Sequence, residues 1–145
     1  REPMSDLLAV QNPLTLRLAL FIGVYLVAAS SALVRPSLAG ALLKSIKASP
    51  GIMHATAALT TFVGLGLLVA HIDLSSAAAI LVTATAIWWT LEGVALLALG
   101  HVLPIDTPFA ISNYARSNIP AAIIGVFLII AGLFGHAVSV TELTP

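Results

Sequence analysis

The segment from Ala77 to Val102 reads AAAILVTATAIWWTLEGVALLALGHV and contains one carboxylate, Glu92, near its middle. A mostly apolar run of about 18 or more residues is long enough to cross roughly 30 Å of hydrocarbon as an α-helix. We therefore predict a transmembrane helix over this segment, and the rest of the chain is interpreted around it.

The composition of the whole chain agrees with a membrane location. Of its 145 residues, 59% are hydrophobic and 8% are charged, whereas about a quarter of the residues of a soluble domain are charged. The formal net charge is zero, so the chain lacks the basic field that recruits nucleic acids, and we expect no nucleic-acid partner. Cysteine is absent, which excludes disulfide bonds, thiolate metal sites and iron–sulfur clusters. The first partner that we expect is the lipid bilayer.

Three further apolar segments reach the length of a span. The four predicted spans, in a single membrane domain over residues 1–145, are residues 14–34, 51–71, 77–102 and 119–140. The first span should end before Pro36, because the residue that precedes a proline is forced out of the α region. Pro120 is placed in the first turn of the fourth span, where its missing N–H costs nothing. Ser75 or Ser76 is the expected N-cap of the third.

Two of the connections between spans are predicted to be short interfacial amphipathic helices, over residues 37–47 and 107–116. In the first, three apolar residues recur at helical spacing while two lysines fall away from that stripe. The stripe is Leu38, Leu42 and Ile46, and the lysines are Lys44 and Lys47.

The second connection starts with Thr107 as N-cap and Pro108 as first helical residue. Phe109, Tyr114 and Arg116 are expected to anchor this helix among the lipid headgroups.

The order of span, proline, amphipathic helix, turn and span occurs twice, with Pro36 and Pro104 in corresponding places. This pattern predicts an all-α integral membrane fold of four transmembrane helices arranged as two helical hairpins. It also suggests an internal repeat, with the two hairpins related by an axis along the membrane normal.

The distribution of basic residues predicts the orientation, and we expect the membrane to be the bacterial inner membrane. The connections inside the two hairpins carry Arg35, Lys44, Lys47 and Arg116, whereas the other side carries Arg17 and Asp73. The positive-inside rule then places the hairpin connections in the cytoplasm and both termini outside.

Glu92 is the main candidate site residue. It lies about ten residues from the cytoplasmic end of its helix, roughly 15 Å deep, where an ionised carboxylate is costly. We expect it to be protonated, paired or hydrated. The polar residues at matching depth are Tyr25, Thr60 and Thr61. Two interpretations stay open: a carboxylate that responds to protons or cations in a transport path or quinone pocket, and a neutral glutamic acid that joins helices by hydrogen bonds.

Trp88 and Trp89 precede Glu92 by four and three residues. Trp88 is expected to share a face with Glu92 and to line the same pocket, while Trp89 is expected to face lipid, a pigment or a neighbouring subunit. Ordinary packing of large side chains is the alternative for both.

The histidines form one pair toward each membrane face. His54 and His101 lie toward the cytoplasmic side, and His71 and His136 toward the outer side. Such pairs could hold a b-type haem through two axial imidazoles. All four lie near span ends, where histidine is common, and none has the spacing of a metal-binding motif, so we expect no metal site.

The sequence carries no catalytic motif, and we expect no enzymatic activity. The preferred hypothesis is an accessory subunit that stabilises a larger membrane complex, formed with other membrane proteins or with copies of itself. A second is a small homo-oligomeric transporter or channel that uses Glu92. A third is a quinone- or haem-binding membrane anchor of a redox complex. None of the hypotheses requires a cofactor except the third.

Overall fold

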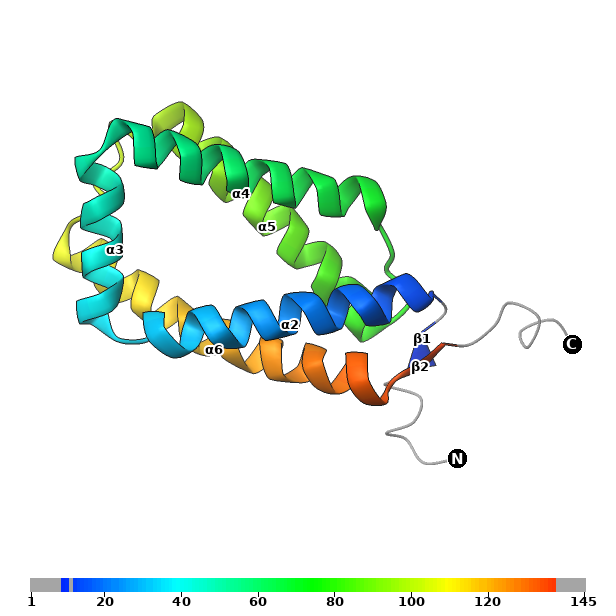
Figure 1. Ribbon diagram of the computed structural model, residues 1–145. Helices are drawn as coiled ribbons and strands as arrows, with labels where there is room; N and C mark the ends of the chain where they lie inside the picture. Colours follow the sequence, from blue (N-terminus) through cyan, green and yellow to red (C-terminus); the bar gives the residue numbers. More distant parts are fainter. Residues whose placement is uncertain (1–8, 11, 138–145) are drawn as a thin grey trace, which may run out of the picture.

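The computed structural model describes residues 9, 10 and 12–137, which form helices and two very short strands (Figure 1). The helices are α2 (Pro13–Leu33), α3 (Pro36–Ala48), α4 (Pro50–Ala70), α5 (Ala77–Leu99) and α6 (Pro108–Phe134), and the strands are β1 (Ala9–Val10) and β2 (His136–Ala137). The four helices α2, α4, α5 and α6 are long and apolar enough to cross a membrane. The prediction of four helices long and apolar enough to span a membrane, in a mainly helical chain, is thus confirmed for the described residues.

The helices begin where local sequence signals place them. The side chains of Asn12, Ser49, Ser76 and Thr107 each accept a hydrogen bond from a backbone N–H of the helix that follows. Four of the five helices also have proline in their first turn, where no backbone donor is lost. Ser76 is the N-cap of α5, as one of the two predicted residues.

The fourth span differs from the prediction. Residues 107–116 do not form a separate interfacial helix, because Pro108–Phe134 is one continuous helix with Pro120 inside it. In hydrocarbon a helix break leaves backbone groups without partners, so continuing through the proline costs less than stopping. Ser117 and Asn118 support the turn before the proline by donating to the Tyr114 carbonyl oxygen at 2.7 and 2.8 Å. Residues 138–140 of the predicted span lie outside the described residues.

The short helix α3 covers the predicted segment 37–47, but its buried side differs from the predicted stripe. Ile46 is buried, whereas Leu38 and Leu42 are 44% and 39% exposed. The other buried residues of α3 are Ala39 and Gly40. These small residues allow α3 to approach α6 closely, where Ile111 packs over Gly40.

The four long helices form two tightly packed pairs, α2 with α6 and α4 with α5 (Figure 1). Neither predicted hairpin is formed: α3 separates α2 from α4, and α5 packs mainly against α4 and not against α6. Glycines allow the close contact between the helices of both pairs. A Cβ on Gly23 would lie 2.7 Å from the Gly125 carbonyl oxygen, and one on Gly64 would lie 2.5 Å from the Thr90 nitrogen. The second half contains no helix equivalent to α3, so the order of elements is not repeated.

The two helix pairs meet mainly near one end. The core there consists of residues of α2, α5 and α6, namely Ala19, Ile22, Ala78, Val82, Leu128 and Ala131. Toward the other end, α3 lies across the gap and contacts both α4 and α6. Only 17–28% of the most apolar window of each span is buried within the chain, so most of the apolar surface is left for lipid or for other proteins.

Candidate functional site

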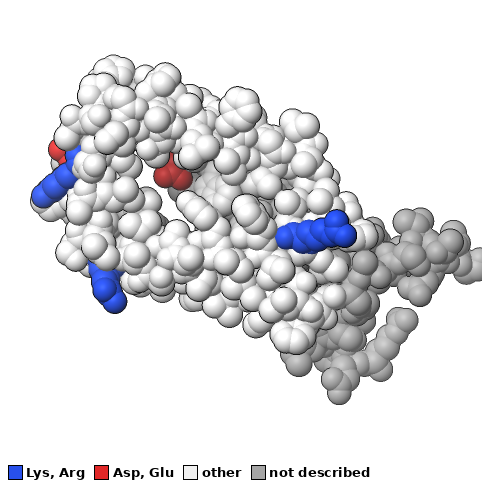
Figure 2. All heavy atoms as spheres, viewed as in Figure 1, with Lys and Arg blue, Asp and Glu red and all other residues white. Residues whose placement is uncertain are grey.

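Glu92 lies on α5 and is half-buried. A hollow separates the α2/α6 pair from the α4/α5 pair on one face of the molecule, and acidic atoms are visible inside it, away from the basic groups of that face (Figure 2). Asp73 and Asp106, the other described acidic residues, lie in the connections before and after α5. Among the described residues, no Lys or Arg side chain forms an ion pair with Glu92.

Of the two tryptophans, it is Trp89 that turns toward the core, although it was expected to face outward. Trp89 packs against the core and forms a T-shaped pair with Tyr25, with ring centroids 5.3 Å apart. Trp88 is 67% exposed. The buried face of α5 passes through Val82, Ala86 and Gly93, and helical spacing puts Trp89 at its centre with Glu92 at its flank.

Trp88 nevertheless remains beside the carboxylate, as predicted, because four residues along a helix bring two side chains to the same side. Its indole lies close to the Glu92 carboxyl group. Glu92 is therefore placed between the two tryptophans, one turned toward the core and one turned outward.

Two tyrosines complete the surroundings of Glu92. Tyr114 of α6 is half-buried and lies within electrostatic range of both Glu92 and Tyr25 of α2. The sequence interpretation included Tyr25 but assigned Tyr114 to the headgroup region. Residues 107–116 belong to the same helix as the fourth span, so Tyr114 lies near Glu92 and not among the headgroups as predicted. Nothing in the sequence around Tyr114 indicates that this residue lies near Glu92.

Thr60 and Thr61 lie on α4, the helix that packs against α5. Their hydroxyls donate to the carbonyl oxygens of Thr56 and Ala57 in their own helix, at 2.9 and 2.8 Å. Thr61 also lies directly against Gly93. Both hydroxyl donors are thus used within α4, and the structure brings neither into a hydrogen bond with Glu92.

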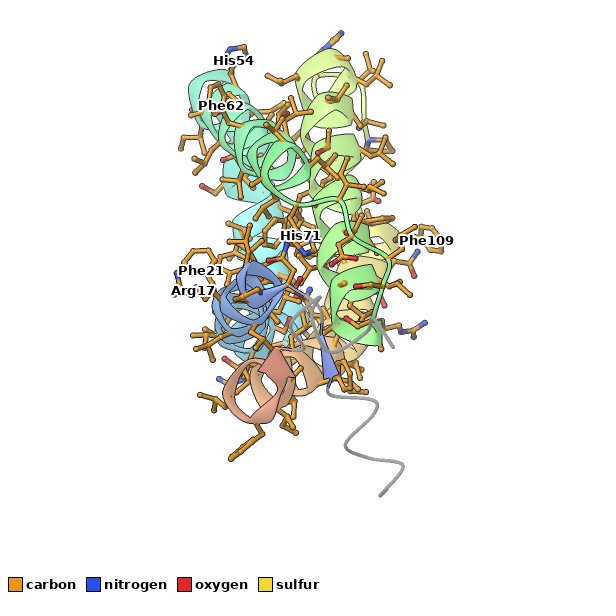
Figure 3. All side chains as sticks on the ribbon, turned by 90° about the vertical axis from the view of Figure 1, so that its right-hand side faces the viewer. Arg17, Phe21, His54, Phe62, His71 and Phe109 are labelled. Atoms are coloured by element: carbon orange, nitrogen blue, oxygen red, sulfur yellow. The ribbon has the colours of Figure 1, made fainter. Side chains whose placement is uncertain are left out.

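A second polar cluster lies where the two helix pairs meet. His71, at the C-terminal end of α4, is 3% exposed, and its Nε2 lies 2.7 Å from Oγ1 of Thr15 in the first turn of α2. Figure 3 shows His71 between α2 and α5, at the end of the molecule that faces the viewer. Its Nδ1 is buried with no hydrogen-bond partner among the described residues. The sequence interpretation named His71 but missed Thr15.

The connection between α4 and α5 contains further hydrogen bonds beside this cluster. The Asp73 backbone carbonyl accepts a hydrogen bond from the Thr83 hydroxyl at 3.1 Å, and its carboxylate accepts one from the Ser75 backbone N–H at 2.8 Å. Hydrogen bonding from Ser75 is the main reason that the pKa of Asp73 is lowered. These bonds hold the connection against the start of α5.

His54 and His101 do not form a comparable site. His54 and His101 are both exposed, and His54 points outward from the molecule in Figure 3. His136 lies in β2, which pairs with β1. Among the described residues, no three histidine, aspartate or glutamate side chains lie together as metal ligands.

Lys47, which was predicted to lie away from the apolar stripe of its helix, forms hydrogen bonds within the protein. Its Nζ donates to the carbonyl oxygens of Gly100, His101 and Leu103 at 2.8–3.1 Å. A cation at these carbonyls, just after the C-terminal end of α5, also interacts favourably with the helix dipole. Lys47 thereby ties the end of α3 to the α5–α6 connection.

Comparisons of the chain with protein-family models, with curated proteins and with solved structures found no match.

Proposed function

We propose that this protein is a small transporter or channel in which Glu92 exchanges a proton or a cation inside the bilayer. The observation that carries this proposal is the position of Glu92, which is half-buried on α5, lies within electrostatic range of Tyr114 in the other helix pair and has no cationic partner among the described residues. A carboxylate in a span costs several kcal/mol and usually marks a substrate or ion pathway.

The arrangement of the helices supports the same function. Each helix pair is held by close contacts at glycine, whereas the two pairs touch mainly near one end. Two bodies that are stiff inside and loosely joined can rock against each other around a fixed site, which is how many transporters alternate access. Glu92 lies between the two bodies.

Flux in liposomes tests this proposal. Vesicles that contain the full chain and an internal pH dye are given a potassium gradient, and valinomycin is added to drive proton entry. The Glu92→Gln variant should lose most of the protein-dependent flux, because it keeps the shape of the side chain but cannot ionise. Asp106→Asn is the matched control, since Asp106 is exposed in the α5–α6 connection. Equal flux with and without the Glu92 carboxyl would contradict the proposal.

The accessory subunit stays as the second candidate function. It is favoured by the small buried share of each span, which leaves wide apolar faces for partner helices. In that case a partner would occupy the hollow and supply a donor to Glu92. Native mass spectrometry from mild detergent tests this candidate: the chain should retain a different membrane protein at fixed stoichiometry. Release as single chains or as copies of itself alone would contradict it.

A further inference from the structure

The aromatic side chains around Glu92 suggest what occupies the hollow. The chain contains two tryptophans and two tyrosines, and these four side chains, from three different helices, are linked to one another or to this carboxylate. Tyr25 and Trp89 form the T-shaped pair, Trp88 lies beside the carboxyl group, and Tyr114 lies within range of Glu92 and Tyr25. Tyr25 and Trp88 are 55% and 67% exposed, so the chain itself leaves much of these side chains uncovered.

A carboxylate among aromatic side chains is suited to a positive ligand. The faces of tryptophan and tyrosine rings attract cations, and they do so more strongly where water is excluded. The chain does not supply that charge itself: the Lys47 ammonium is held by three carbonyl oxygens, and no other described cation pairs with Glu92.

The surroundings favour an organic cation over a hydrated metal ion. Hard metal ions require several oxygen ligands, whereas the described residues offer no group of three metal-binding side chains. A shallow groove on α2, lined by Arg17, Leu20, Phe21, Val24 and Tyr25, is almost entirely apolar. Figure 3 shows Arg17 and Phe21 on the outer side of α2.

We propose that the hollow binds a lipophilic organic cation, with its positive charge at Glu92 and its apolar groups against the tyrosine and tryptophan rings. This inference rests on the proposed function and names the substrate class of the same site. Binding exchanges the proton of the neutral carboxyl group for the charge of the ligand. One proton is released to the solvent for each monovalent cation bound, and no other reactant is needed.

Tetraphenylphosphonium is a direct probe of this site. The full chain in mild detergent is titrated with the cation, and binding is measured by equilibrium dialysis and by quenching of tryptophan fluorescence. Tetraphenylborate has nearly the same size and apolar surface with the opposite charge, so it controls for simple partitioning into the micelle. We expect saturable binding of the phosphonium, no saturable binding of the borate, and release of one proton per cation in weakly buffered solution.

Substitutions then assign the binding to Glu92. Glu92→Gln should weaken phosphonium binding by about tenfold or more, because one partner of a desolvated charge pair is lost. Glu92→Asp keeps the charge and should retain part of the affinity, while Asp106→Asn should bind like the wild type. Each variant is first checked for the gel-filtration profile and helical circular dichroism of the wild type. Equal binding by Glu92→Gln, or equal binding of the borate, would overturn the inference.

The liposome assay separates this inference from the proposed function. Saturable phosphonium binding through Glu92 without any flux would support the ligand class and contradict transport. Proton flux through Glu92 in a protein that does not bind the phosphonium would support transport and overturn the ligand class.

Discussion

At the scale of single residues, His71 is the buried side chain whose environment is least complete. One ring nitrogen lies 2.7 Å from the Thr15 hydroxyl, and the other is buried with no partner among the described residues. A buried polar group without a hydrogen-bond partner destabilises the folded protein, because it has lost its hydrogen bonds to water and formed none in their place. The contact with Thr15 therefore matters more than an exposed hydrogen bond would, and it joins α4 to α2.

Replacement of Thr15 by valine tests this contact. Valine keeps the branched shape but removes the hydroxyl, so the Nε2 atom of His71 loses its partner and neither ring nitrogen then has one among the described residues. We expect the free energy of unfolding to fall by about 1–3 kcal/mol, seen as a lower midpoint of thermal unfolding in detergent. Thr15→Ser keeps the hydroxyl and should unfold closer to the wild type. A valine variant as stable as the wild type would show that the contact contributes nothing.

At the scale of helices, glycine decides which elements pack together. The missing side chains of Gly23 and Gly125 bring α2 against α6, and those of Gly64 and Gly93 bring α4 against α5. Small residues are especially important in membranes, because lipid chains are as apolar as leucine and helices associate through close van der Waals contact. Stiffness within each pair follows from this close approach.

Two glycines of α4 offer a matched test. A Cβ at Gly64 would lie 2.5 Å from the backbone nitrogen of Thr90, whereas a Cβ at Gly66 would meet nothing within 4 Å. Gly64→Ala should force α4 and α5 apart and destabilise the protein by about 1–3 kcal/mol. Gly66→Ala should be neutral or slightly stabilising, because alanine favours the helix. Thermal unfolding of both variants measures the difference, and equal midpoints would mean that α4 and α5 do not depend on this contact.

At the scale of the whole molecule, the two helix pairs are joined at one end by a small core and bridged toward the other by α3 (Figure 1). Under the proposed function, we expect one pair to rock against the other, so that the surroundings of Glu92 change while the glycine contacts within each pair stay intact.

Distances between spin labels test this expectation. The chain lacks cysteine, so labels can be introduced at chosen exposed positions. A label at Phe62 of α4 is combined with one at Ile123 of α6, and in a second protein with one at Leu91 of α5; these side chains are 81%, 66% and 61% exposed. Addition of tetraphenylphosphonium should shift the 62–123 distance distribution measured by pulsed electron paramagnetic resonance. The 62–91 distribution should stay unchanged, and an equal shift in both would argue against stiff pairs.

The candidate site could be predicted from the sequence only in part. Glu92 is recognisable because it is the one acidic residue in a long apolar segment, and Trp88 is near it because both lie on one helix. Tyr114 could not be found, since its nearness to Glu92 depends on α6 continuing through Pro120 and on how α6 lies relative to α5. Likewise, Thr61 is at a suitable depth but faces Gly93, which depth alone does not reveal.

The amino-acid sequence by itself determined the number of helices long and apolar enough to span a membrane, the approximate limits of the first three and the N-cap of the third, because span length, hydropathy and helix capping are local properties. Only the tertiary structure decided that α2 pairs with α6 and α4 with α5, that Trp89 and not Trp88 faces the core, and that a hollow borders Glu92. The physical reason is that these helices are apolar on nearly every side. No stripe of polarity marks which face packs inward, so close contact at small residues on helices distant in the sequence makes that choice.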